Sequence, residues 1–232
     1  MKLWRLADPR DFRFAEVAGR GTWVATEETE EGVCPSCGAS RQQRVQPLVI
    51  EWLRGPAELG DFTWAGRSPV VVDRAFAELS ESFSGFESGP VAAVNERKRF
   101  SAKQQRDRGL SLPELDPPLH ELWVTTRVHL DAQRSTVDHE NHCEVCGCDR
   151  WRVHGVERWD SQYDREKKKL VRVRTERVPN SGIYLHETDL GGADIFRVVE
   201  TPVSVFCTDR VRAMIEREKF SNVSFLEMGE IL

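Results

Sequence analysis

Two short cysteine motifs constrain this chain more than any other feature of the sequence. CPSCG at residues 34–38 and CEVCG at residues 143–147 contain four of its six cysteines. Two residues between the cysteines allow the chain to turn, so that both sulfur atoms face one metal ion. The glycine that follows accepts the positive φ that such turns favour. We therefore expect each motif to form a metal-binding turn.

The two motifs together predict one shared site. A closed tetrahedral site needs four ligands, and Cys34, Cys37, Cys143 and Cys146 supply four thiolates. We predict that these cysteines hold one structural zinc ion. The 105 residues from 38 to 142 far exceed the spacing of an ordinary zinc ribbon. The ion would therefore tie the two halves of the chain together and couple metal binding to folding.

Other uses of these residues stay open at this point. His139, His142 and Cys148 lie close to the second motif and could replace a thiolate, which would leave each motif in a separate site. A redox dithiol normally opens a helix in a thioredoxin-like unit, whereas Gly38 and Gly147 favour turns that lead into strands. Iron fits the same thiolate ligands as zinc.

Composition and charge place the chain among globular proteins. Its 232 residues are 39% hydrophobic and 31% charged, which allows a core in one domain or in two small ones. The net charge of -5 does not favour nucleic acid or an anionic membrane as a partner. The sequence shows no targeting segment and no apolar stretch long enough to span a bilayer. We expect a cytoplasmic protein, in which cysteine pairs bind metal or act in redox chemistry.

Hydrophobic periodicity predicts the elements around the motifs. In the first half we expect a polar loop over 1–33, strands over 44–53 and 70–72, a helix from Asp73 to Gly85 and an exposed basic helix over 95–108. In the second half we expect strands over 122–130, 151–156 and 170–178, the last with a basic outer side, and then a strand, a helix and a strand over 203–206, 211–215 and 223–226.

A weak internal similarity indicates the fold class. DRAFAEL at 73–79 resembles DRVRAMI at 209–215, and each segment follows a strand downstream of one cysteine motif. Three prolines between 113 and 118 suggest a boundary. We predict an α+β fold of two related strand-helix-strand halves, residues 1–112 and 113–232, joined by a zinc-ribbon-like four-cysteine site. Alternatively, the halves form one integrated domain.

The sequence shows no catalytic motif beside the cysteines. HExxH, P-loop, GxSxG and GxGxxG patterns are missing, and a site closed by four thiolates leaves no position for a reactive water. We therefore expect a protein that is not an enzyme and has no small-molecule substrate. Two basic stretches, 95–108 and 163–177, are interleaved with acidic residues and lack regular aromatic residues. They predict solvated faces rather than a nucleic-acid surface.

The motifs and the C-terminal tail resemble a known family. CPSCG at 34–38, CEVCG at 143–147 and the tail that begins with ADIFR at 193–197 occur in the order of the myxobacterial double-CxxCG family. Members of this family include cytosolic immunity proteins of swarm-inhibition systems, which neutralise a lipoprotein toxin passed between kin cells. The resemblance covers the two motifs and residues 193–232. Ala39 and Ser40 stand where the family often has an aromatic residue.

The resemblance implies a cytosolic immunity protein that binds and blocks a cognate protein toxin. Such an inhibitor needs exposed anchors on a rigid surface, and Trp64, Trp123 and Trp159 are candidates besides their ordinary role in packing. A zinc-ribbon protein that binds nucleic acid or serves transcription is the second hypothesis, and a thiol-redox protein is the third. The sequence indicates neither the toxin nor the oligomeric state.

Overall fold

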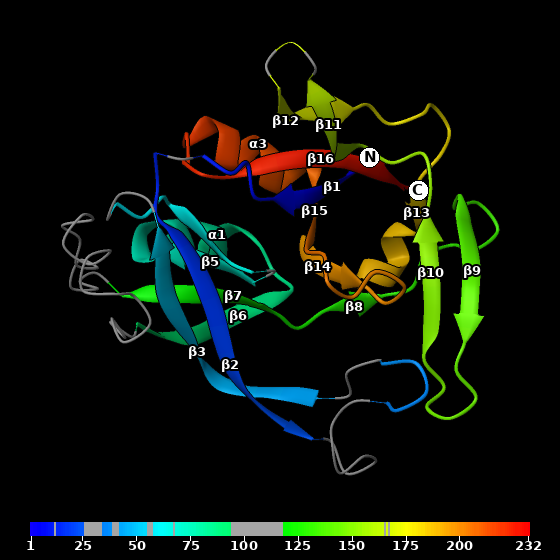
Figure 1. Ribbon diagram of the computed structural model, residues 1–232, viewed down its shortest axis with the longest axis horizontal. Helices are drawn as coiled ribbons and strands as arrows, with labels where there is room; N and C mark the ends of the chain where they lie inside the picture. The colour runs from blue at the N-terminus through cyan, green and yellow to red at the C-terminus, as the bar shows by residue number, and fades with distance from the viewer. Residues whose placement is uncertain are drawn as a thin grey trace.

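Most of the chain that the structure describes forms β-strands. The computed structural model describes residues 1–11, 13–25, 34–38, 42–54, 58–66, 68–93, 118–164, 166 and 168–232. In these residues two six-stranded sheets are accompanied by two two-stranded ribbons, the helices α1 and α3 and the short 3-10 helix η2. The fold is therefore mixed but rich in sheet, with few helices (Figure 1).

The first sheet has the strand order β2-β3-β6-β7-β5-β4. Its strands are β2 (Glu16–Ala25), β3 (Gln42–Arg54), β4 (Phe62–Ala65), β5 (Ser68–Val72), β6 (Phe86–Ala93) and β7 (Leu119–Val124). Helix α1 (Asp73–Ser82) connects β5 to β6 and buries Ala75 and Leu79. The strands predicted over 44–53 and 70–72 lie within β3 and β5, and the predicted helix is α1, because their apolar spacing is strong.

The second sheet has the strand order β13-β16-β1-β15-β14-β8. Its strands are β1 (Lys2–Ala7), β8 (Arg127–Val128), β13 (Ile183–Leu185), β14 (Ile195–Val198), β15 (Phe206–Thr208) and β16 (Ser224–Ile231). Helix α3 (Asp209–Arg217) connects β15 to β16, and η2 (Glu187–Leu190) follows β13. The predicted helix and last strand near the C-terminus correspond to α3 and β16, whereas the strand predicted over 203–206 shares only Phe206 with β15.

Two antiparallel ribbons extend from this body. One pairs β9 (Val137–His142) with β10 (Asp149–Val153), and the other pairs β11 (Arg158–Asp164) with β12 (Lys169–Thr175). In Figure 1 the β11–β12 ribbon stands above β16, and the far ends of β2 and β3 reach toward the turn between β9 and β10.

One central core lies between the two sheets. Phe62 and Leu122 of the first sheet are fully buried in it, together with Ile195 of the second sheet. Leu79 of α1 and Ile215 of α3 complete the same cluster. Because both sheets and both helices bury apolar side chains against one another here, this core unites the two halves of the chain.

The structure is not built of two strand-helix-strand halves, so this part of the predicted fold is wrong. Sheets dominate, and each sheet contains a strand from the other half of the chain: β1 lies between β15 and β16, and β7 lies between β5 and β6. Local sequence patterns indicate strands but not their pairing partners, which explains the difference. The predicted boundary between residues 112 and 113 lies outside the described residues, as does the helix predicted over 95–108.

Two further predictions are corrected by the structure. Residues 1–33 contain β1 and β2 rather than a loop. In β1 the side chains of Leu3, Trp4 and Leu6 are all buried, because a central strand covered on both faces shows no simple alternation. The single strand predicted over 122–130 is divided into β7 and β8, because the amides of Thr125 and Thr126 donate to the carbonyl of Gly85 instead.

Candidate metal centre

Each CxxCG motif forms a tight turn closed by a backbone hydrogen bond. The Gly38 amide donates to the Cys34 carbonyl at 2.8 Å, and the Gly147 amide donates to the Cys143 carbonyl at 2.6 Å. The φ angles of the two glycines are 69° and 65°, which side-chain-bearing residues rarely adopt. Both motifs lead into strands, β3 and β10, as predicted from their glycines.

The two turns meet at one point. Cys34 Sγ lies 3.7 Å from Cys143 Sγ, and Cys37 Sγ lies 3.6 Å from Cys146 Sγ. All four sulfur atoms lie within 4.8 Å of one another. A tetrahedral ion with metal–sulfur bonds of about 2.3 Å separates its ligands by about 3.8 Å, which fits these distances. The predicted meeting of the four cysteines is confirmed, and they lie close enough to hold a metal ion.

The cluster is shielded from solvent and its backbone amides favour thiolates. Cys34, Cys143 and Cys146 are buried, and Cys37 is half-buried. The Cys146 amide donates to Cys143 and lowers the pKa of that thiol to about 6, against the effect of burial, and the Val145 amide adds to the shift. Burial instead raises the pKa of Cys146. A cation held between the four sulfur atoms would favour its thiolate as well.

The other ligand candidates near the second motif have different partners. His139 Nε2 and His142 Nδ1 both lie 2.8 Å from Asp149 Oδ1, and the hydrogen bond with Asp149 raises the pKa of His142. The Cys148 thiol lies 3.7 Å from the carbonyl oxygen of Asp149, to which it donates. In the described part of the chain, the group placed to hold a metal consists of the four motif cysteines. The geometry therefore favours one shared site over two separate sites.

Arg150 is a residue of this centre that the sequence analysis missed. It lies on β10, and its Nη2 donates to the carbonyl of Cys37 at 2.6 Å. The guanidinium thus links the strand that follows the second motif to the turn of the first motif. An arginine three residues after a CxxCG glycine carries no distinctive signal, because its partner is remote in sequence.

Two of the three candidate tryptophan anchors contribute to packing. Trp64 packs against the central core, and its Nε1 donates to the carbonyl of Asn222 at 2.9 Å. Trp159 packs against the core of the second sheet beneath the guanidinium of Arg172, at 4.7 Å. Trp123 is half-buried on β7. Cys207, the remaining cysteine, is fully buried on β15, and burial raises the pKa of its thiol.

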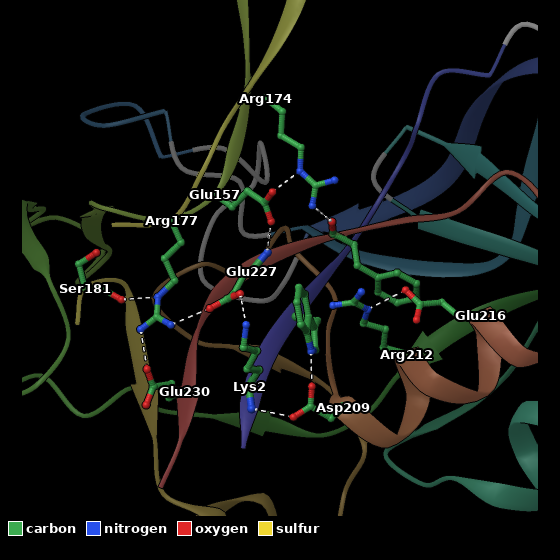
Figure 2. A network of polar contacts seen from close by, with 12 residues as sticks. Lys2, Glu157, Arg174, Arg177, Ser181, Asp209, Arg212, Glu216, Glu227 and Glu230 are labelled. Carbon is green, nitrogen blue, oxygen red and sulfur yellow. Dashed lines mark hydrogen bonds and ion pairs between the residues drawn. The ribbon is translucent and has the colours of Figure 1, made fainter. Parts of the chain in front are cut away.

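A charged network attaches the β11–β12 ribbon to the second sheet (Figure 2). The Glu157 carboxylate accepts a hydrogen bond from Arg174 and another from the Glu227 amide, the latter at 2.6 Å. Arg177 donates to the carboxylates of Glu227 at 2.9 Å and Glu230 at 3.0 Å. Arg174, on the side of β12 predicted to be a basic outer face, remains exposed but also pairs with Glu157 of the body.

This network predicts a pH-dependent stability. Burial tends to raise the pKa of Glu157, but the hydrogen bonds from Arg174 and the Glu227 amide outweigh it and hold that pKa below its usual value. A carboxyl whose pKa is lower in the folded state stabilises the protein above its unfolded pKa, and this stabilisation is lost as the pH falls through the folded pKa. We expect the midpoint of urea unfolding to fall between about pH 5 and about pH 3.

The variant Glu157→Gln tests the origin of this slope. It should flatten the pH dependence over that range, because the titrating group is gone. Glu187→Gln, on the exposed turn η2, is the matched control and should keep the slope of the parent protein. An unchanged slope in Glu157→Gln would assign the acid sensitivity to other carboxyl groups.

The described residues define a sheet-rich protein in which two distant CxxCG turns form a four-cysteine cluster able to hold one metal ion. No protein-family model matches the chain, and no curated protein matches it. Across the described ranges, no helix combines the length and the apolar character needed to cross a membrane.

Proposed function

We propose that this protein is a cytosolic immunity protein, which binds and neutralises a cognate bacterial toxin and holds one structural zinc ion. The observation that carries the proposal is the meeting of the two CxxCG turns, since the resemblance to the myxobacterial double-CxxCG family rests on this pair and on the tail that follows it. A tetrahedral set of four thiolates is typical of structural zinc sites, which stabilise a scaffold and take no part in chemistry. The protein would neutralise the toxin by binding to it and blocking its activity.

The tip of the β11–β12 ribbon is the surface we favour for the toxin. Tyr163 and Leu170 stand opposite each other on the two strands and are 60% and 69% exposed. Adjacent exposed apolar side chains on a surface mark sites of interaction, and an aromatic anchor often carries much of the binding free energy. Lys168 and Lys169 are exposed beside this pair and favour a partner with acidic groups around an apolar patch.

The same ribbon gives less support to the nucleic-acid hypothesis. Arg172 donates to the carbonyl of Pro9 at 3.2 Å and lies over Trp159, while Arg174 and Arg177 are paired with carboxylates in the charged network. These arginines of the basic stretch 163–177 are thus engaged within the protein. The other basic stretch, 95–108, lies outside the described residues.

Co-expression tests the proposed function. The chain should restore growth of a bacterial host that produces the protein encoded beside it, and the two proteins should purify together. Failure both to restore growth and to bind would contradict the proposal. Tight, salt-dependent binding of DNA or RNA at about 150 mM salt would instead favour the nucleic-acid hypothesis.

The ribbon surface makes a separate prediction. The double variant Tyr163→Ala/Leu170→Ala should weaken toxin binding at least about tenfold, because it removes an aromatic anchor and its apolar neighbour. Its melting temperature should stay close to that of the parent protein, since both side chains are exposed. Val203→Ala, at a side chain that is 46% exposed before β15, is the control and should bind normally. Equal affinities for the two variants would place the toxin elsewhere.

A further inference from the structure

The two six-stranded sheets share one arrangement of five strands. The order β3-β6-β7-β5-β4 in the first sheet corresponds to β13-β16-β1-β15-β14 in the second. Strand directions agree too: the first pair of each series is parallel and the next three pairs are antiparallel. Four of the five strands also follow the same chain order, with a helix before the last one in both halves.

The central strand of each series comes from the other half of the chain. β1, at the start of the chain, completes the second sheet, and β7, which follows β6, completes the first. Leu119 of β7 pairs with Val72, directly before α1, and Leu3 of β1 pairs with Thr208, directly before α3. This register makes Leu3 equivalent to Leu119, and the next residues, Trp4 and His120, equivalent to each other.

The rings of Trp4 and His120 make the first pair of equivalent side-chain contacts, each with the first residue of a helix. Trp4 Nε1 donates to Asp209 Oδ1 at 2.6 Å, and His120 Nε2 lies 2.9 Å from Asp73 Oδ1. Asp209 and Asp73 are the first residues of α3 and α1. A ring nitrogen on the exchanged strand therefore contacts the same helix position in both halves.

The fourth residue of each helix stacks on the same ring. The guanidinium of Arg212 lies 3.9 Å from the centre of the Trp4 ring. In the other half, Phe76 stacks on His120 with ring centres 4.5 Å apart. The chemistry of the pair differs between the halves, whereas its position is kept.

The second residue of each helix forms an equivalent ion pair. Arg74 Nη2 lies 2.8 Å from Asp61 Oδ1 before β4, and Arg210 Nη1 lies 3.3 Å from Asp194 Oδ1 before β14. The carbonyls of the two aspartates also accept equivalent bonds at 3.1 Å, from the last residues of β5 and β15.

Reciprocal contacts cross from each half to the other. Arg74 lies over the ring of Phe220 at 5.1 Å, and Arg210 lies over the ring of Phe83 at 5.7 Å. Each of these phenylalanines follows the helix of the opposite half. An arginine of one half thus meets the helix end of the other half, in both directions.

The residue after each phenylalanine makes an equivalent backbone hydrogen bond to the opposite half. The carbonyl of Ser221 accepts the amide of Phe62 at 3.2 Å, and the carbonyl of Ser84 accepts the amide of Ile195 at 3.1 Å. The phenylalanines and serines stand in the same order, so one alignment of the two halves accounts for all these contacts.

We propose that the chain is a tandem duplication of one unit, and that the two units have exchanged their first strands. The protein then corresponds to a strand-exchanged dimer fused into one chain. Each unit contributes one CxxCG turn to the shared centre, where Cys34 faces Cys143 and Cys37 faces Cys146. Independent origins would not repeat the same strand order, ring contact, ion pair and reciprocal contacts at matching positions. This inference does not depend on the proposed toxin.

The duplication also sets the β11–β12 ribbon apart. In the first unit the strand that follows the cysteine turn, β3, begins at Gln42 and itself enters the sheet, where it pairs with β6. In the second unit the chain leaves the cysteine turn as β10 and forms the ribbon before it enters the sheet as β13. The ribbon is therefore an insertion into the second unit. The first unit has the same scaffold without a ribbon at the equivalent position.

Placing the Trp4–Arg212 contact pair at the equivalent positions of the first unit tests whether the two units are equivalent. The full-length double variant His120→Trp/Phe76→Arg gives the first unit the ring and cation that Trp4 and Arg212 form in the second. Its melting temperature should fall by less than the sum of the losses of the two single variants. His120→Trp/Ala77→Arg is the control, since Ala77 is exposed on the adjacent position of α1, and its losses should add. Additive losses in both pairs would overturn the equivalence.

Strand exchange has its own test, which needs no change within the described fold. A protease site inserted between Gln105 and Arg106 allows the folded full chain to be cut outside the described residues. After cutting and removal of metal by a chelator, the two fragments should still elute together, because each holds the central strand of the other's sheet. Separation into two folded fragments would overturn the exchange.

Discussion

Replacing Cys34 or Cys143 by serine is expected to abolish metal binding and to destabilise the protein to the same extent. The two sulfur atoms lie 3.7 Å apart and come from different halves of the chain, so each substitution opens the same four-thiolate site. Structural zinc binds small domains with apparent free energies of about 10–16 kcal/mol. Because hydrophobic cores also hold this fold together, we expect a smaller loss, of at least about 3 kcal/mol.

The measurement combines metal analysis with urea unfolding, with and without a chelator. The parent protein should contain about one metal ion per chain and lose stability with the chelator. Cys148→Ser is the matched control, because Cys148 lies beside the cluster but outside the group placed to hold the ion. It should retain both metal and stability. If Cys34→Ser lost the metal while Cys143→Ser retained it, the motifs would belong to separate sites.

Gly85→Ala is expected to destabilise the protein strongly, although it lies outside the metal centre. A Cβ at this position would lie 2.1 Å from the carbonyl oxygen of Ile195 and 2.9 Å from Ala193 Cβ, and the φ of Gly85 is +101°. The carbonyl of the preceding residue, Ser84, accepts the amide of Ile195 in β14 of the other sheet, so the backbone here has little room to move. We expect a loss of at least about 3 kcal/mol from strain and steric clash together.

Gly191→Ala separates these two effects. Gly191 also has a positive φ of +56°, but a Cβ there would meet no atom within 4 Å. Its cost should be limited to backbone strain, about 1 kcal/mol. Thermal and urea unfolding of the two variants provide the comparison. Equal losses would show that the contact between Gly85 and Ile195 has no specific role.

The parts of the structure that were predicted correctly depend on local patterns. CxxCG determines its own turn, so the two cysteine turns followed from the sequence, and the meeting of their four cysteines followed from the number of ligands that a tetrahedral metal needs. β3, β5 and α1 have clear apolar periodicity over their length. The tail that contains β15, α3 and β16 has it as well.

The parts that were missed depend on pairing between remote segments. β1 is buried on both faces, so Leu3, Trp4 and Leu6 follow no alternation that would reveal a strand. The pairing of β1 with β15 and of β7 with β5 is set by topology, which a local pattern does not contain. The ion pair of the exposed Arg174 was missed because its partner Glu157 lies on the connection before the ribbon. Arg150 reaches Cys37 from 113 residues away.

X-ray absorption spectroscopy on the purified protein tests the central claim most directly, which is that the two halves share one four-thiolate zinc site. The absorption edge identifies the element, and the scattering reports the atoms bound to it. We predict about one zinc per chain, surrounded by four sulfur atoms at about 2.3 Å. Nitrogen or oxygen ligands near 2.0 Å, an iron edge, or two metal ions per chain would contradict this claim.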